Sequence, residues 1–335
     1  MGHAGLSIGV YGATGALGSE LLAALGDSAL QVGSLRAIAT DASLGRDVEF
    51  QGESVPVETE TRGLVGLDLV FCCAPPEAST ACVREALRAE VACIDCSGAM
   101  AGSPEVPLRV AALGDRIPEA APLLAAPADA ALAWAPVLAA LHAEAPLSRL
   151  TATALEGASA AGRKGIDALY KESLALFNQE DLPEGEAMGQ RLAFDCLPGF
   201  GPLDEAGGSE RERALVGGLR RLLGVEFAMS VASVHVPVFV GHAAHLVVES
   251  ENELDAERLA ECLARAAGVD VWGGGAAGPT LRAAAGHERV IVGRMQVDAE
   301  SPRCLQLWLV GDLLRLAARN AVELAAVQVA PKLGK

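Results

Sequence analysis

A glycine-rich turn directly after the first apolar segment constrains the fold of this chain more than any other feature. The segment LSIGVYG (6–12) has the length and composition of a buried strand, and Leu17, Leu21 and Leu25 then recur at helical spacing. The turn GATGALG (12–18) joins the two, and its glycines allow backbone N–H groups to approach a pyrophosphate at the positive end of the helix. The alternative is a turn that packs helix on strand without a ligand.

Apolar strands and helices continue to alternate after this turn. Further short apolar strands are predicted at 31–40, 68–75, 91–98 and 122–127, and a helix is predicted at 77–90. Strands that alternate with helices form parallel sheets covered on both faces. The first part of the chain is therefore predicted to be a Rossmann-type, doubly wound α/β domain.

The pattern changes after about residue 128. The strands become longer and alternate with polar residues, as in 226–250, and helices are expected at 209–223 and 255–267. Ser209 with Glu212 three residues later predicts a capping box at the start of the first of these helices. This part is predicted to be a second, α+β domain.

The last helix, 312–330, has an apolar face that suits a return to the first domain. The expected boundaries are 1–127 together with 313–330 for the dinucleotide-binding domain, and 128–312 for the second domain. A chain of 335 residues is long enough for two such domains.

Composition excludes several classes of protein. The formal net charge of -17 would repel a polyanion, so a nucleic-acid partner is not expected. The longest apolar stretch, 120–141, is interrupted by Asp129 and by prolines, so no membrane span is expected. We expect no secretory leader before the first strand, and we expect the eight scattered cysteines to be reduced in a cytoplasmic protein.

The end of the second strand carries the residues expected to meet the ribose of a dinucleotide. Thr40, Asp41 and Ser43 lie about twenty residues beyond the glycine turn. An acidic group there hydrogen-bonds a ribose diol and repels a 2′-phosphate, which favours NAD over NADP. The alternative is that Asp41 is a solvated turn residue.

Three later motifs, in order behind the glycine turn, carry a resemblance to a known family. They are VPVFVGH (236–242), VGR (292–294) and LWLVGDLLRLAARNAV (307–322). With them the chain resembles the aspartate-β-semialdehyde dehydrogenase family, and especially its usg-like branch. The resemblance covers nearly the whole chain. It implies a homodimer of Rossmann and α+β dimerisation domains, with the C-terminal helix closing on the first domain.

Enzymes of this family act in amino-acid biosynthesis and reduce β-aspartyl phosphate with NADPH. A cysteine takes the acyl group as a thioester and a histidine moves the protons, which requires a sulfur nucleophile that is anionic at neutral pH. Matching the family's N-P-N-C-S-T to APADAA (126–131) places Asp129 at the cysteine and Ala128 at the preceding asparagine. The sequence therefore has a carboxylate where the family reaction needs a thiolate.

Other positions of the family's active site are replaced as well. By the resemblance, Glu156 stands at the glutamine before the motif matched by SAAG (159–162), and His235 stands at the arginine that clamps the substrate carboxylate. Ala101 stands at a phosphate-binding arginine and Ala214 at a helical lysine. Ala42 stands at a cofactor-side arginine, and Leu313 stands at an asparagine. The family residues that remain are His242, Glu212, Arg315 and the glycine turn.

The resemblance and the turn together give the candidate site residues. The catalytic positions are His242, Asp129 and Glu156, and the substrate-pocket positions are His235, Glu212 and Ala101. The candidate cofactor-binding residues are Gly12, Ala13, Thr14, Gly15, Ala16, Leu17, Gly18, Thr40, Asp41, Ser43 and Arg315. No clustered ligands suggest a metal site.

These replacements predict weak or absent semialdehyde dehydrogenase activity. Two like charges about 4 Å apart repel by about 4 kcal/mol at an effective dielectric near 20, and the family substrate carries both a carboxylate and a phosphate. Asp129 is expected to pair with His242 instead of acting as a nucleophile. Cys96 is a rival thiol at a strand end, although the alternative of a small buried residue is favoured.

Three functions remain open on the sequence. The chain is a degenerate homologue that binds a dinucleotide and dimerises, a non-catalytic partner of an active paralogue, or an oxidoreductase of altered substrate or mechanism. An intact glycine turn favours dinucleotide binding, and the missing cysteine disfavours the family reaction.

Overall fold

The computed structural model describes residues 5–59, 63–114, 121–181, 185, 187–199, 201, 203–273 and 277–333. The chain folds into two compact units, which are described separately below. The first consists of Met1–Ala128 with Ala317–Lys335, and the second consists of Asp129–Leu316.

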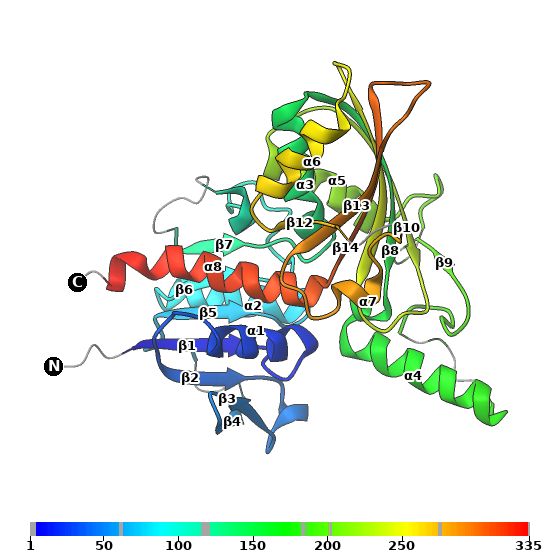
Figure 1. The fold of residues 1–335 in the computed structure, drawn as a ribbon. Helices are drawn as coiled ribbons and strands as arrows, with labels where there is room; N and C mark the ends of the chain where they lie inside the picture. Colours follow the sequence, from blue (N-terminus) through cyan, green and yellow to red (C-terminus); the bar gives the residue numbers. More distant parts are fainter. Residues whose placement is uncertain are drawn as a thin grey trace. The chain divides into compact units, whose positions relative to one another are not determined.

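The first unit is built on one sheet, and its strand order confirms the predicted doubly wound α/β fold (Figure 1). The order is β3-β4-β2-β1-β5-β6-β7, and every neighbouring pair is parallel except β3 with β4. The bounds are β1 Leu6–Tyr11, β2 Val32–Ile38, β3 Asp47–Phe50, β4 Glu53–Glu58, β5 Leu69–Cys72, β6 Ala92–Asp95 and β7 Leu123–Ala125. Because β2 and β5 lie on opposite sides of β1, the order reverses at β1, where ligands of such sheets bind beyond the carboxyl ends of the strands.

Helices α1 (Ala16–Gly26) and α2 (Pro76–Arg88) follow β1 and β5, and α8 (Leu313–Leu333) completes the unit. Buried side chains of α8, including Ala318 and Leu324, belong to the same hydrophobic cluster as Leu21 and Leu25 of α1. Two polar side chains of α8 also bond backbone groups of the unit. Asn320 accepts the N–H of Ala111 at 2.7 Å, and Gln328 donates to the carbonyl of Ala121 at 2.6 Å. The predicted return of the last helix to the first domain is confirmed.

The second unit contains a mixed seven-stranded sheet with the order β12-β13-β14-β11-β8-β10-β9. The strands are β8 Leu147–Glu156, β9 Leu197–Pro198, β10 Ala228–His235, β11 His242–Ser250, β12 Val269–Val271, β13 Val290–Val297 and β14 Cys304–Gly311. The helices are α3 Ala131–Glu144, α4 Gly162–Asn178, α5 Glu210–Leu223, α6 Ala256–Arg265 and α7 Leu281–Ala284. This is the α+β organisation predicted from the longer alternating strands.

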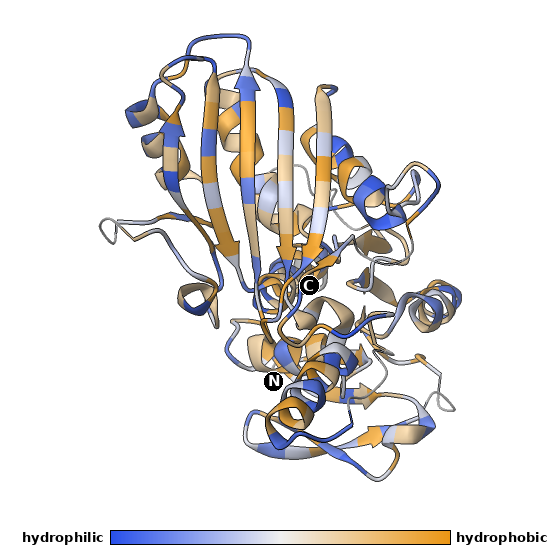
Figure 2. Ribbon diagram, turned by 90° about the vertical axis from the view of Figure 1, so that its right-hand side faces the viewer, coloured by the Kyte–Doolittle hydropathy of each residue, from blue (hydrophilic) through white to orange (hydrophobic). Residues whose placement is uncertain are grey.

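The long strands of this sheet have a covered and an uncovered face. Hydrophobic and hydrophilic residues interleave along them (Figure 2), and the buried residues of β11 alternate with exposed ones such as His245 and Glu249. Helix α3 packs against both α5 and α6, and α5 contacts β10 while α6 contacts β12 and β13. In the described part of the chain, no helix has the length and hydropathy needed to cross a membrane.

Candidate functional site

In the first unit, the glycine turn has the shape that a bound pyrophosphate requires. A Cβ on Gly18 would lie 2.2 Å from the Gly12 carbonyl oxygen, and a Cβ on Gly12 would lie 2.5 Å from the backbone nitrogen of Ala74. Gly12 also has a φ of 91°, which L side chains rarely adopt. Only glycine therefore allows the turn, the neighbouring strand and the helix to approach so closely.

The N-terminus of α1 is available to an anion. Gly15 is the N-cap, no side chain caps the helix, and no acidic residue occupies its first turn. The N–H groups of a first helical turn have no partner inside the helix, and the helix dipole favours negative charge there. This arrangement fits the diphosphate of a dinucleotide.

The structure joins the glycine turn to the residues that follow β2. The hydroxyl oxygens of Thr14 and Ser43 lie 3.0 Å apart, and Asp41–Ser43 form a short 3-10 helix. Thr40 and Asp41 are exposed beside this contact, while Ser43 is buried. Thr14 and Ser43 therefore lie together in the first unit, with Asp41 open to solvent.

In the second unit, three polar side chains lie side by side on the covered face of the sheet. Glu156 of β8 is paired in register with His242 of β11 on one side and with His235 of β10 on the other. Directly paired residues of neighbouring strands project from the same face. All three residues are buried, His242 completely.

Asp129 enters this unit immediately before α3. Its Oδ1 accepts the N–H of Ala131 at 2.9 Å. Burial raises the pKa of Asp129, and the negative charge of Glu156 raises it further, although the hydrogen bond from Ala131 and the positive charge of Arg211 lower it. A carboxyl group with these surroundings holds its proton more firmly than a solvated aspartate does.

The predicted direct pairing of Asp129 with His242 is wrong. Nε1 of Trp134 donates to Nε2 of His242 at 2.8 Å, and Nδ1 of His242 lies 3.2 Å from Oε1 of Glu156. Trp134 and Glu156 therefore lie against both ring nitrogens, whereas the hydrogen bond of Asp129 is to the backbone of Ala131. The contact of His242 with Glu156 has the distance of an ion pair without the alignment of a hydrogen bond.

The charge of Glu156 is stabilised by its neighbours. Burial alone would raise its pKa, but His242, His235 and Arg211 together hold the pKa below its usual value. The pKa of His235 is lowered, chiefly because of burial, although Glu156 opposes the shift. The cluster thus combines an ionised glutamate with an aspartate whose pKa is raised.

Sequence reasoning missed two members of this cluster, Trp134 and Arg211. Trp134 is fully buried on α3, and a buried indole N–H needs an acceptor, so its presence in a helix beside the site was a usable signal. Arg211, an exposed residue in the first turn of α5, interacts electrostatically with both Glu156 and Asp129, and partial desolvation of its guanidinium lowers its pKa. Nothing in the segment SERER distinguishes Arg211 from Arg213 before the helix is placed.

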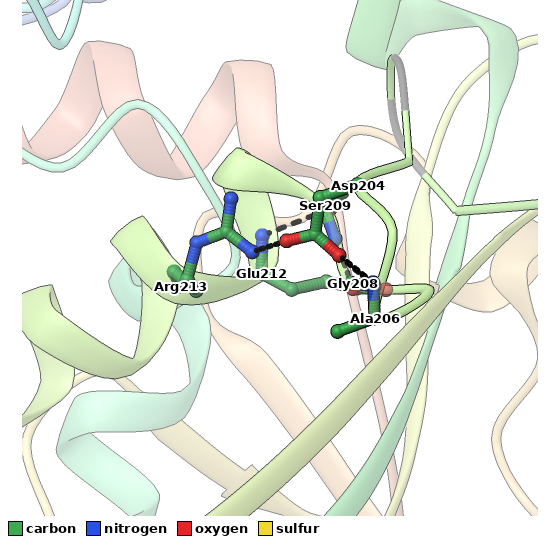
Figure 3. A network of polar contacts seen from close by, with 6 residues as sticks. All are labelled: Asp204, Ala206, Gly208, Ser209, Glu212 and Arg213. Carbon is green, nitrogen blue, oxygen red and sulfur yellow. Dashed lines mark hydrogen bonds and ion pairs between the residues drawn. The ribbon is translucent and has the colours of Figure 1, made fainter.

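Glu212 has a structural role at the start of α5. It forms the predicted capping box with Ser209, and Figure 3 shows this contact beside the turn at Asp204. The other oxygen of Glu212, Oε1, accepts the N–H and the hydroxyl of Ser233 at 2.7 and 2.8 Å. Asp204 in turn accepts N–H groups of Ala206 and Gly208 and pairs with Arg213.

The remaining candidates lie on other elements of the chain. Ala101 is in a turn that follows Asp95, whose carboxylate accepts N–H groups of Ser97 and Met100 in the first unit. Arg315 lies in the first turn of α8, where its N–H donates to Asp312. The described residues contain no group of three or more histidine, cysteine or acidic side chains able to hold a metal ion.

The rival thiol is buried and unreactive in character. Cys96 is 2 % exposed, and its contact with Cys73 and its burial raise its pKa well above the usual value. A reactive cysteine needs an accessible thiolate, which this environment opposes.

Comparison with known proteins agrees with the architecture. Residues 7–118 match the family model described as "Semialdehyde dehydrogenase, NAD binding domain", and residues 138–316 match "Semialdehyde dehydrogenase, dimerisation domain". The chain is 30% identical over 334 residues to an aspartate-semialdehyde dehydrogenase of Synechocystis, with 97% of each chain covered. It is 29% identical over 329 residues to a USG-1 protein homolog of Pseudomonas aeruginosa, covering 97% of this chain and 98% of that protein.

Solved structures give the same result. Aspartate semialdehyde dehydrogenase II from Vibrio cholerae is 26% identical, with a TM-score of 0.89 over 97% of this chain and 99% of that chain. A probable aspartate-semialdehyde dehydrogenase from Pseudomonas aeruginosa is 28% identical, with a TM-score of 0.90 over 97% of this chain and 98% of that one. This chain belongs to the semialdehyde dehydrogenase family and has both its NAD-binding and its dimerisation domain.

Proposed function

We propose that this protein is a dimeric, dinucleotide-binding member of the family that has lost the thioester reaction on β-aspartyl phosphate. The observation that carries the proposal is Asp129, a half-buried carboxyl group that accepts the N–H of Ala131 at the position where the resemblance expects the cysteine. A thiolate forms an acyl bond and later releases it, whereas a carboxylate gives an adduct with an aldehyde that is a poor hydride donor.

The charges of the cluster also disfavour the family substrate. Glu156 is ionised beside Asp129, and Arg211 is the cation that faces both. A substrate with a carboxylate and a phosphate would have to compete with these two side chains for Arg211. Each charge-assisted hydrogen bond lost in that competition removes about 1.5 to 3 kcal/mol of binding free energy.

The glycine turn supports dinucleotide binding in the first unit. Backbone N–H groups of residues 13–18 would hold the diphosphate, and Thr40, Asp41 and Ser43 would meet the ribose. The exposed carboxylate of Asp41 favours NAD over NADP. When bound, the nicotinamide supplies or accepts a hydride. Arg315 is a candidate cofactor-binding residue by the resemblance alone.

The uncovered face of the second sheet supports a homodimer. In the dimerisation domain this face carries a hollow of about 380 Å³ lined by His245, Arg294, Gln296, Gln306, Leu307 and Trp308. We take 1–127 with 313–330 as the dinucleotide-binding domain and 128–312 as the dimerisation domain. The alternative is that this face binds an active paralogue with a similar surface in place of a second copy of this chain.

A second function is favoured by the opposite pKa shifts of two neighbouring carboxyl groups. The raised pKa of Asp129 and the lowered pKa of Glu156 are typical of an acid and a base in one site. An oxidoreductase acting on a neutral alcohol or carbonyl compound needs a proton donor and no thiolate. A panel of neutral aldehydes and ketones assayed with NADH and NADPH tests this alternative.

Two measurements test the main proposal. Calorimetry with NAD and NADP is expected to show binding, with NAD the tighter ligand. Oxidation of aspartate semialdehyde in the presence of phosphate and either dinucleotide is expected to be undetectable in the unmodified protein. Turnover at the rate of an ordinary dehydrogenase would disprove the loss of the family reaction, and the absence of binding to either dinucleotide would disprove the cofactor role.

A further inference from the structure

We infer that Trp134 is a positioning residue that holds His242 as a neutral imidazole with its ring proton on Nδ1, so that both ring nitrogens are engaged inside the protein. The inference deepens the proposed function, and it rests on that proposal only for the role of position 129. It concerns three side chains of the second unit, on α3, β11 and β8.

The indole of Trp134 determines which nitrogen of His242 carries no proton. An indole N–H donates and never accepts, and Nε1 of Trp134 lies 2.8 Å from Nε2 of His242. Nε2 must therefore present its lone pair to the indole. An imidazolium would place a second N–H group against that of Trp134, so this contact excludes the doubly protonated ring.

A neutral ring with a bare Nε2 carries its remaining proton on Nδ1, the nitrogen that faces Glu156. Its Oε1 lies 3.2 Å from Nδ1 of His242, and an ionised carboxylate only accepts. The hydrogen-bond partner of one ring nitrogen sets the protonation of the other in histidine. The Trp134 bond thus sets the tautomer through Nε2, and the Glu156 carboxylate, which lies beside Nδ1 without a hydrogen bond, is compatible with a proton there.

Burial makes this arrangement persistent. The side chains of Trp134 and His242 are both fully buried, with their ring centroids 5.9 Å apart. Turning the imidazole over would replace Nε2 by a carbon and leave the indole N–H without an acceptor in a dry environment, which is costly. Of the two restraints, the Trp134 bond is the better aligned.

The arrangement removes the histidine from proton transfer at position 129. Asp129 precedes α3, and Trp134 lies in the first turns of that helix. A thiol introduced at position 129 would therefore meet a histidine whose Nε2 is already bonded to the indole. We expect the Asp129→Cys change alone to leave that thiol without an imidazole partner.

Nitrogen NMR on the full chain tests the tautomer directly. At neutral pH, the ¹⁵N signals of His242 should show a pyridine-type Nε2 and a pyrrole-type Nδ1. In Trp134→Phe this pattern should be lost, with the proton appearing on Nε2 or exchanging between the nitrogens. Trp272→Phe is the matched control, because it removes an indole bond to the Ala277 carbonyl in the same unit and should leave His242 unchanged.

The wild-type spectrum alone can overturn the inference. A proton on Nε2, or on both nitrogens, would contradict it even if Trp134→Phe failed to fold. An unchanged pattern in a folded Trp134→Phe protein would show that Trp134 does not set the tautomer.

Thiol alkylation supplies a second measurement that needs no substrate. Asp129→Cys should react with iodoacetamide at the rate of an unactivated thiol. Asp129→Cys combined with Trp134→Phe should react about tenfold faster. A released histidine that lowers the pKa of the neighbouring thiol by one unit increases the thiolate fraction about tenfold. Equal rates in the two variants would contradict the inference.

The two proposals fail separately. Restoration of the family reaction by Asp129→Cys alone, with the His242 pattern unchanged, would contradict the claim that the bonded histidine is unavailable. Family activity in the unmodified protein would instead contradict the proposed function and leave the tautomer assignment standing.

Discussion

Replacing Glu212 with alanine should cost about 2 to 4 kcal/mol of stability in the second unit at neutral pH. The N–H of Ser233, in a residue that is 8 % exposed, would lose its acceptor, and an unsatisfied buried donor costs about 1 to 3 kcal/mol. Loss of the capping box with Ser209 adds about 1 kcal/mol. The resemblance places Glu212 in the substrate pocket, whereas these bonds assign it to holding α5 against β10.

The cost should depend on pH in a defined direction. Burial raises the pKa of Glu212, but the hydrogen bonds from Ser209 and Ser233 outweigh it and hold the pKa below its usual value of 4.5. An acid with a lowered folded pKa stabilises the fold above its unfolded pKa and loses that contribution as pH falls through the folded value. The difference between wild type and variant should therefore be constant at neutral pH and shrink below about pH 4.5.

Hydrogen exchange followed by mass spectrometry measures this locally, which matters because a chain of two units need not unfold in one step. Peptides covering 209–223 and 228–235 should exchange faster in Glu212→Ala. Glu210→Ala is the matched control: it removes an exposed acid from the same helical turn, which should cost only the helix-dipole contribution of about 0.3 to 1 kcal/mol. Equal effects of the two substitutions would refute the reasoning and return Glu212 to the list of ligand contacts.

Two further predictions concern the other candidate sites. Gly18→Ala should destabilise the first unit by about 1 to 3 kcal/mol and weaken NAD binding in calorimetry, because the new Cβ would lie 2.2 Å from the Gly12 carbonyl oxygen. Gly217→Ala is the control: that position on α5 has open space around it, so the substitution should have neither effect. Asp129→Asn should stabilise the protein at neutral pH, by about 1.4 kcal/mol for each unit by which the folded pKa is raised. The folded state of the wild type holds the Asp129 proton more tightly than the unfolded state does. The difference in unfolding free energy between variant and wild type, measured with urea, should therefore grow as pH rises from 3.8 through the folded pKa. A difference that does not change with pH would contradict this prediction.

Periodicity was sufficient to predict most of the first unit. Strand β1, the glycine turn and α1 follow from one run of apolar spacing and three glycines, and the capping box at Ser209 follows from two residue types at fixed separation. These are local signals, in which the backbone requirement and the residue that meets it are neighbours in the chain. The hairpin of β3 and β4 was missed because its strands are largely polar and exposed, and its turn uses Gln51 and Gly52, both with positive φ, instead of a common turn pair.

The site was harder to predict because its contacts join distant parts of the chain. Asp129 and His242 were expected to pair because a thiolate and an imidazole are partners in the family reaction. The structure shows that strand register decides the outcome: Glu156 lies directly opposite His242, and the indole of Trp134 reaches Nε2. Register and the direction of a helical side chain are set by packing, which residue types at a given spacing do not encode.

The polar groups of the second unit bond to one another, and this argues against a site open to the family substrate. An active site keeps donors and acceptors directed at the reacting atoms, where they are satisfied only when substrate is bound. Here Ala131 engages Asp129, Trp134 and Glu156 engage His242, and Arg211 balances the two carboxylates. Groups coupled in this way respond non-additively to mutation. Restoring the cysteine alone therefore leaves the histidine bonded and the glutamate charged, and recovery of the family reaction should require changes at 129, 134 and 156 together.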